Sequence, residues 1–346
     1  MQDGFVQLMQ TLAPDLAQEM LLRALVLERI AIMAPVGRRQ LAAKLNLTER
    51  EIRAAAGVLK EGGFISFDAS GMTLTPKAEA VLPAVRDFTR AVHGLAEMES
   101  RLADLLHVGR VCIVAGNADT DSGVLPELGR IAAQRVRGYL HTGSTLAVTG
   151  GSTMAETARA MQSPAPMRVM VVPARGGLGR EVETQANTLA AEIAQRLGGH
   201  HRLIHLPDHM DDAAKQEMLK LPDVREAMEL IQRADVILHG IGCAADTIRE
   251  TKLSASQARK LLADGAVGES FGSFFDRSGN CLLESSSVGV DLARLTPACR
   301  MIAVAAGRHK AEAIISVLRH DRHALLVTDE GAAKEMLRLL DEGTEQ

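Results

Sequence analysis

Residues 146–161, LAVTGGSTMAETARAM, combine a short apolar run, a Gly-Gly-Ser-Thr turn and a helical stretch in immediate succession. The two glycines allow a tight turn, and the backbone N–H groups at the start of the following helix point toward an anion. Ser152 and Thr153 add hydroxyl donors. The segment matches neither GxGxxG nor GxxxxGK[ST], so it does not support dinucleotide or P-loop chemistry. Alone, it fits a phosphate-binding turn and an ordinary tight turn equally well.

Three further apolar runs end in similar loops. VVPARGGLGREVETQAN at 171–187 places Arg175 directly after its apolar run, VILHGIGCA at 236–244 ends in glycines, and VAAGRHKAEAI at 304–314 carries Lys310. A surface arginine most often forms an ion pair, but its planar fork also suits a phosphate. Because open α/β sheets bind ligands at the carboxyl ends of their strands, we expect the four loops to converge on one anionic ligand. Gln185 and Asn187 are candidates for binding its hydroxyl groups.

The region from residue 108 to residue 346 alternates short apolar runs with helical stretches. Strands buried on both faces and separated by helices are typical of a doubly wound, mostly parallel α/β sheet. The expected strands lie at 111–115, 145–149, 167–172, 201–206, 236–239, 301–305 and 324–328.

A different pattern precedes this region. Helices are expected over 14–33, 39–45 and 49–61, followed by two short strands at 64–67 and 72–74 that flank a tight turn. This order is typical of a winged helix-turn-helix. A long connecting helix is then expected over 75–106. We therefore divide the chain into a DNA-binding unit, a helical linker and an effector domain, at 1–90, 91–107 and 108–346.

The helix at 49–61 is the candidate DNA reader. Thr48 and Glu51 predict a capping box at its start, and its outer face carries arginines that can contact guanine or phosphate. The alternative is a small helical domain for dimerisation or protein contact, whose basic residues are simply solvated. Gly57 within the helix favours that alternative, since it costs about 1 kcal/mol relative to alanine. The candidate DNA-contacting residues are Arg38, Arg39, Thr48, Arg50 and Arg53.

Composition excludes several other classes. The net charge of −4 argues against a chain coated in basic surface, and one Tyr with no Trp leaves few platforms for stacking RNA bases. The four cysteines lie far apart without a CxxC pair, which excludes a zinc finger and a disulfide scaffold. No apolar run is long enough to cross a membrane. We expect a cytoplasmic protein with no membrane partner, no metal and no cofactor.

The sequence gives little support for catalysis. Neither GxSxG nor HExxH occurs, and the histidines have no partners at metal or triad spacing. Glu269, in AVGESFGSFF at 266–275, suits either a general base on a sugar carbon or a hydroxyl acceptor that only fixes a ligand. An enzyme with an appended helical domain therefore stays as the alternative to a regulator.

Taken together, these segments resemble the SorC/DeoR-type bacterial regulators, and within them the branch that controls glycolytic genes. The resemblance extends over nearly the whole chain. It is carried by VGRRQLAAKLNLTEREIRAAAGVLKEGGFI at 36–65, GMTLT at 71–75, VTGGSTM at 148–154, VPARGGLGREVETQANT at 172–188, ILHGIG at 237–242, ESFGSFF at 269–275, SVGVDL at 287–292, KAEAI at 310–314 and LVTDEGAAK at 326–334.

This resemblance implies a repressor that binds double-stranded operator DNA as a homo-oligomer, a dimer or tetramer, and that fructose 1,6-bisphosphate or a related phosphosugar releases. It also implies an effector domain with the fold of sugar-phosphate isomerases and deaminases but without their catalysis. The family's ligand-binding positions correspond to Gly150, Gly151, Ser152, Thr153, Arg175, Gln185, Arg249, Glu269 and Lys310.

Overall fold

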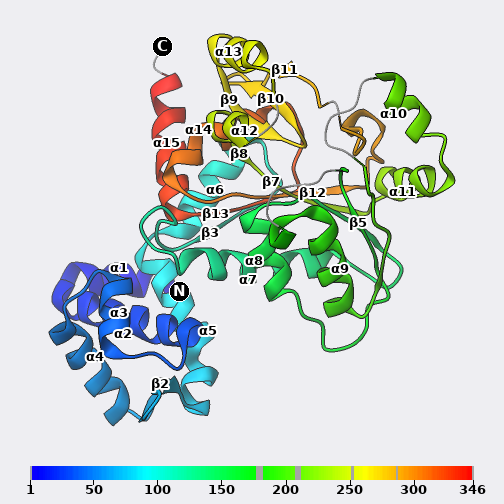
Figure 1. Ribbon diagram of the computed structural model, residues 1–346. Helices are drawn as coiled ribbons and strands as arrows, with labels where there is room; N and C mark the ends of the chain where they lie inside the picture. The colour runs from blue at the N-terminus through cyan, green and yellow to red at the C-terminus, as the bar shows by residue number, and fades with distance from the viewer. Residues whose placement is uncertain (1, 177–181, 207–211, 251–252, 286, 345–346) are drawn as a thin grey trace.

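The computed structural model describes residues 2–176, 182–206, 212–250, 253–285 and 287–344 (Figure 1). A small N-terminal unit of helices with a two-stranded sheet lies beside a larger α/β unit. None of the described helices is both long and apolar enough to cross a membrane.

The N-terminal unit has the predicted order of helices and strands. Its helix α4 begins with the predicted capping box, in which the Thr48 hydroxyl accepts from the Glu51 backbone N–H at 3.2 Å while the Glu51 carboxylate accepts from the Thr48 N–H at 2.8 Å. Leu41, Ile52 and Leu59 are buried in its core. The elements are α1 (Gln2–Leu12), α2 (Pro14–Met33), α3 (Arg38–Leu45), α4 (Glu49–Glu61), β1 (Ile65–Asp68), β2 (Gly71–Leu74) and α5 (Pro76–Val92). Helix α1 was not predicted.

The expected single helix over 75–106 is wrong. Helix α5 ends at Val92, and Gly94 adopts a left-handed conformation with φ of 63° before α6 (Leu95–Leu106) begins. This turn lets α6 change direction and bury Leu95 and Leu102 in the core of the large unit. The segment after Gly94 is therefore packed as part of the α/β unit.

A seven-stranded parallel sheet forms the centre of the large unit. Its order is β3-β13-β12-β7-β4-β5-β6, and six of the seven predicted strands belong to it with ends shifted by a few residues. The strand predicted at 201–206 is largely wrong, because β6 pairs with β5 only through His200 and His201. The strands are β3 (Val111–Val114), β4 (Thr145–Val148), β5 (Met170–Pro173), β6 (His200–His201), β7 (Val236–Gly240), β12 (Arg300–Val304) and β13 (Leu325–Asp329).

Helices cover both faces of this sheet, which confirms the doubly wound class (Figure 1). Helices α7, α8 and α9 pack together on one face. Helices α6, α14, α15 and α11 cover the other. The helices not yet located are α7 (Val124–Tyr139), α8 (Ser152–Ala160), α9 (Ala186–Leu197), α10 (Asp212–Met218), α11 (Pro222–Gln232), α14 (Ala311–His320) and α15 (Glu330–Thr344), with 3-10 turns at Val182–Thr184, Leu292–Arg294 and Arg308–Lys310.

A second, antiparallel sheet was not predicted. Its order is β11-β10-β9-β8, and it follows directly from the carboxyl end of β7. Gly268 in β9 allows a close approach to α14, because a Cβ there would lie 2.9 Å from the carbonyl oxygen of Ala313. The elements are β8 (Gly242–Cys243), α12 (Ala244–Glu250), α13 (Ala255–Ala263), β9 (Ala266–Ser270), β10 (Ser273–Asp276) and β11 (Cys281–Leu283).

Candidate functional site

The four loops singled out in the sequence follow four strands that are consecutive neighbours in the sheet, β12-β7-β4-β5. Strands β4, β5 and β6 extend the sheet in one direction, and β7, β12 and β13 extend it in the other. The order therefore reverses between β7 and β4, where open α/β sheets place their ligands. We call the loops at these four carboxyl ends the strand-end site.

The Gly-Gly-Ser-Thr turn lies at the centre of the strand-end site. Gly151 has φ of 117°, and its N–H donates to the carbonyl oxygen of Thr184 at 2.9 Å. Helix α8 begins at Ser152, and no side chain caps the N–H groups of its first turn. Ser152 itself is exposed. Thr153 is buried, and its hydroxyl donates to the carbonyl oxygen of Val304 at 3.2 Å. Thr153 thus joins the turn to β12, whereas Ser152 is exposed to solvent.

Arg175 and Glu269 face each other across the site. The Arg175 Nη1 lies 4.0 Å from the Glu269 Oε1, and the two side chains are 27% and 17% exposed. The same carboxylate oxygen accepts from the Gly272 N–H at 2.6 Å. Glu269 lies opposite Gly242 in the β8–β9 pairing, so the small sheet carries this carboxylate to the end of β7. An arginine and a carboxylate so placed can bind a phosphate and a sugar hydroxyl respectively.

Gln185 and Asn187 have different environments. Gln185 is the half-buried residue before α9. Asn187, the other candidate for binding ligand hydroxyls, uses its amide within the protein: it donates to the carbonyl oxygen of Ile204 at 2.8 Å and accepts from the N–H of the same residue at 3.1 Å. Asn187 is buried and anchors α9 to the segment after β6.

The remaining two candidates carry positive charge. Lys310, at the start of α14, is half-buried and donates to the carbonyl oxygen of Ile241 at 3.3 Å, which places its amine beside the loop after β7. Arg249 lies on α12 with 74% of its side chain exposed, and its guanidinium is 2.6 Å from the Asp246 carboxylate. Lys310 is therefore tied to the strand-end site, whereas Arg249 is paired with an acid on its own helix.

A cavity of about 450 Å³ lies beside the strand-end site, around the start of α15. Its cations are paired with acids: Arg308 lies 2.9 Å from Glu335, Arg338 lies 2.6 Å from the same residue, and Lys334 lies 2.6 Å from Glu330. An anion entering this cavity would have to displace those pairs, just as an anion at Arg175 would compete with Glu269.

Two buried histidines, His239 and His323, lie in contact near the carboxyl end of β7. Neither was among the residues singled out from the sequence. His239 Nε2 lies 2.8 Å from His323 Nε2, and His239 Nδ1 lies 2.9 Å from the Ser270 hydroxyl. Burial lowers the pKa of His323 to about 4, and it lowers the pKa of His239 well below the ordinary value. Both rings are therefore neutral near pH 7. The histidine inside the apolar run ILHGIG was the available signal.

The candidate DNA-reading face has the predicted exposure. Arg38, Arg50 and Arg53 are exposed and make no hydrogen bond or ion pair with another residue in the described part of the chain. Arg39 pairs with Glu49 at 3.0 Å. The hydroxyl of Thr48 is occupied by the capping box. The hairpin tip between β1 and β2 carries no basic residue. The exposed arginines among these candidates therefore lie on α3 and α4.

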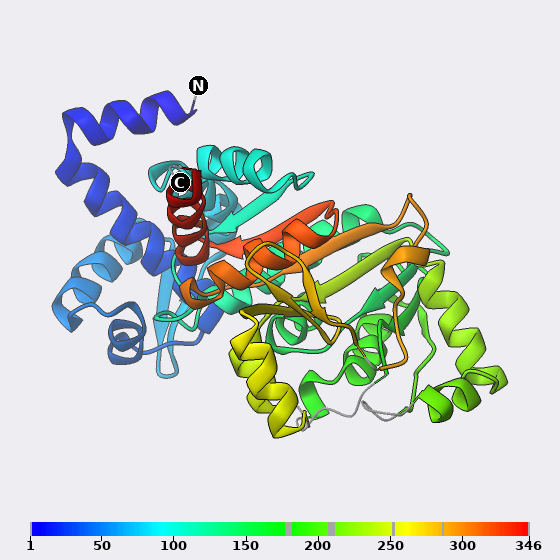
Figure 2. The ribbon, with the colours of Figure 1, turned by 90° about the horizontal axis from the view of Figure 1, so that it is seen from above.

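The loop between β3 and α7, residues 115–123, connects the two units. Toward the strand-end site, Asp119 accepts from the His309 ring at 2.6 Å and from the His309 N–H at 3.2 Å. Toward the N-terminal unit, Asp121 pairs with the guanidinium of Arg29, a buried residue of α2. Ser122 accepts from the Lys44 amine of α3 at 2.9 Å. We call this segment the connecting loop; Figures 1 and 2 show the N-terminal unit at this side of the sheet.

Two further contacts lie beside the connecting loop, one within the α/β unit and one between the two units. Asp329, fully buried at the end of β13, accepts from the N–H groups of Ala118 and Gly307 at 2.7 and 2.9 Å, so it joins the connecting loop to the loop after β12. His93, just after α5, lies 2.8 Å from Glu330. Burial opposes ionisation of Glu330, but hydrogen bonds from His93, Lys334 and a backbone N–H lower its pKa to about 2.

Comparison with protein families gives two matches. Residues 90–338 match the family "Putative sugar-binding domain", and residues 20–89 match the family "CggR N-terminal DNA binding domain". The chain is 36% identical over 337 residues to the Central glycolytic genes regulator of Priestia megaterium, covering 97% of this chain and 98% of the relative. It is 35% identical over 334 residues to the Central glycolytic genes regulator of Bacillus subtilis, covering 96% and 98%.

Solved structures show the same architecture. A SorC family transcriptional regulator from Enterococcus faecalis superposes with a TM-score of 0.65 at 33% identity, over 70% of this chain and 99% of that chain. The full-length sorbitol operon regulator SorC from Klebsiella pneumoniae superposes with a TM-score of 0.63 over 87% of this chain and 94% of that chain, at 18% identity. The second likeness concerns the fold alone.

Proposed function

Because this chain belongs to the sugar-binding-domain family that includes the central glycolytic genes regulators, we propose that it is a repressor of glycolytic genes whose effector is a phosphosugar, most closely fructose 1,6-bisphosphate. The proposed assembly is a homo-oligomer, a dimer or tetramer, that binds double-stranded operator DNA. The effector domain then acts as a sensor and not as an enzyme.

The strand-end site is the observation that carries this proposal. It offers an uncapped helix start at Ser152 for one phosphate and two cations, Arg175 and Lys310, for further anionic groups. Glu269, held by the Gly272 N–H, is an acceptor for sugar hydroxyls. Donors for phosphate on separate strand ends suit a ligand with more than one phosphate better than a ligand with one.

The connecting loop supplies a route from this site to DNA. A phosphate that draws Lys310 toward it also acts on the neighbouring His309, whose ring and backbone are bound to Asp119. Two residues further along, Asp121 pairs with Arg29 in the N-terminal unit. Ligand binding lowers DNA affinity if it favours an arrangement of the two DNA-reading helices that no longer matches the operator.

The first experiment is a thermal-shift screen of the full chain. It compares fructose 1,6-bisphosphate with fructose 6-phosphate, glucose 6-phosphate and dihydroxyacetone phosphate. A ligand at 100 times its Kd stabilises the folded state by about 2.7 kcal/mol. We expect the bisphosphate to give the largest shift and Arg175→Ala to remove it. No shift with any of the compounds would contradict the proposal.

A turnover assay separates the sensor from the alternative enzyme. Fructose 6-phosphate, glucosamine 6-phosphate and ribose 5-phosphate are the substrates to test. Isomerisation or deamination that depends on Glu269 would favour a sugar-phosphate enzyme with an appended helical unit. We expect no turnover.

A further inference from the structure

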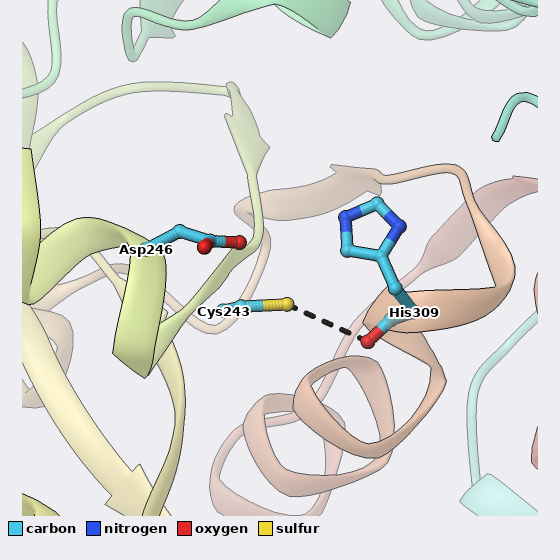
Figure 3. A group of neighbouring side chains, drawn as sticks. All are labelled: Cys243, Asp246 and His309. Carbon is cyan, nitrogen blue, oxygen red and sulfur yellow. Dashed lines mark hydrogen bonds between the residues drawn. The ribbon is translucent and has the colours of Figure 1, made fainter.

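Three side chains with metal-binding atoms converge beside Lys310 (Figure 3). Cys243 comes from β8, Asp246 from the first turn of α12, and His309 from the turn before α14. One ligand atom from each lies within 4.8 Å of the others. The group draws on two loops that are 66 residues apart in the chain, so the fold and not local sequence brings it together.

The orientation of the His309 ring suits a metal ligand. Its Nδ1 lies 2.6 Å from the Asp119 carboxylate, and Figure 3 shows the opposite ring nitrogen facing Asp246. If Nδ1 donates its proton to Asp119, Nε2 presents a lone pair to the group. In most metal-bound histidines, the ring nitrogen that does not bind the metal donates a hydrogen bond to a carboxylate, a backbone carbonyl or water. This hydrogen bond fixes the tautomer and raises the basicity of the ring.

We propose that Cys243, Asp246 and His309 bind a divalent transition metal ion of the zinc class, with a fourth position open to solvent or to a further ligand. One sulfur, one imidazole and one carboxylate are a donor set that zinc accepts in tetrahedral sites. A thiolate makes the harder ions Mg²⁺ and Ca²⁺ poor occupants. The three metal-binding side chains are not among the candidate phosphosugar contacts, but they border two of them, Lys310 and Arg249.

The geometry requires only a small closure. Bonds of roughly 2.0–2.3 Å in a tetrahedron place neighbouring donor atoms about 3.5 Å apart. Since the three donor atoms lie within 4.8 Å of one another, each pair must approach by about 1.3 Å at most. Asp246 has 50% of its side chain exposed and Cys243 is half-buried, so side-chain rotation can supply this movement. Asp246 would share its carboxylate between the metal and Arg249, its present partner at 2.6 Å.

The Cys243 thiol donates a hydrogen bond to the carbonyl oxygen of His309 at 3.6 Å (Figure 3). Binding replaces that proton with the metal ion and releases the proton to solvent.

The test uses Co²⁺ as a spectroscopic substitute for zinc in the full-length chain. A thiolate bound to Co²⁺ gives a charge-transfer absorption in the near ultraviolet, which histidine or carboxylate ligands alone do not give. We expect one equivalent per chain, displaced by Zn²⁺. Cys243→Ser should abolish the band, and His309→Ala should weaken Co²⁺ binding at least tenfold. Cys281→Ser is the matched control, because Cys281 is exposed and lies outside the group.

Two results would overturn the proposal. One is the absence of a charge-transfer band at saturating Co²⁺. The other is a band that survives Cys243→Ser or disappears equally with Cys281→Ser. Circular dichroism of each variant checks that it folds. Since the readout needs neither phosphosugar nor DNA, failure here leaves the proposed function untouched, and failure of the proposed function leaves this test valid.

Discussion

Gly123→Ala tests the contact between the two units most sharply. An added Cβ would lie 0.9 Å from the Arg29 Nη1, so the guanidinium must leave its buried position. The backbone itself tolerates alanine, since φ is −80° and ψ is −9°. Arg29 then loses its charge-assisted pair with Asp121, which contributes about 1.5–3 kcal/mol. In its buried position, the Arg29 Nη1 has no hydrogen-bond partner among the described residues, which costs free energy. Moving the guanidinium into water relieves this cost.

The net loss in the free energy of unfolding is therefore expected near the lower end of this range, about 1.5 kcal/mol. For a unit of the size of the N-terminal one, this lowers the melting temperature by roughly 10 °C. Differential scanning calorimetry should show the N-terminal unit melting earlier, separated from the α/β unit. Gly138→Ala on the same helix α7 is the control, because a Cβ there meets nothing within 4 Å. A Gly123→Ala profile that matches wild type would refute the role given to Arg29.

Four further outcomes are expected. Gly150→Ala places a Cβ 2.5 Å from the carbonyl oxygen of Thr184, so it should remove most phosphosugar affinity in a thermal-shift titration while circular dichroism stays unchanged. The pKa of His323 is about 4 in the folded chain against an ordinary value of 6.5, so its contribution to stability is complete above pH 6.5 and falls as pH drops toward 4, by roughly 3 kcal/mol. His323→Gln should flatten that part of the stability–pH curve measured by urea unfolding; an unchanged slope would contradict the assignment. Thr48→Ala should cost the N-terminal unit about 1 kcal/mol in the same assay, through loss of the capping box. Arg53→Ala should weaken DNA binding measured by fluorescence anisotropy without changing the phosphosugar thermal shift, and equal loss of both would contradict the division between the units.

Local pattern predicted the elements whose burial is regular along the chain. Six of the seven strands of the large sheet are apolar runs covered by helices on both faces, so composition alone marks them. The exception is β6, which consists of the exposed residues His200 and His201. The capping box at Thr48 and Glu51 is likewise a signal contained within four residues. The small antiparallel sheet was not predicted, because its strands have only two to five residues and include Gly242 and Gly268. Their conformation depends on packing against α14 and α12.

Contacts distant in the chain limited what could be predicted of the site. The Gly-Gly-Ser-Thr turn and Arg175 could be singled out because each follows an apolar run. Nothing in the sequence indicates that Asn187 binds the backbone of Ile204, or that Asp121 pairs with Arg29, 92 residues away. The break between α5 and α6 rests on the left-handed conformation of Gly94 within an otherwise helical pattern. Each of these depends on tertiary packing that residue spacing does not encode.

The most direct test of the central claim is a release experiment on DNA. A labelled operator fragment, selected by the protein from its own genomic DNA, is bound at low salt and titrated with fructose 1,6-bisphosphate while anisotropy is recorded. We predict that the bisphosphate releases the fragment from the wild-type chain, and that Arg175→Ala binds DNA normally but needs at least tenfold more ligand. DNA affinity that is unchanged by the bisphosphate, or an Arg175→Ala chain that responds as wild type does, would contradict the account.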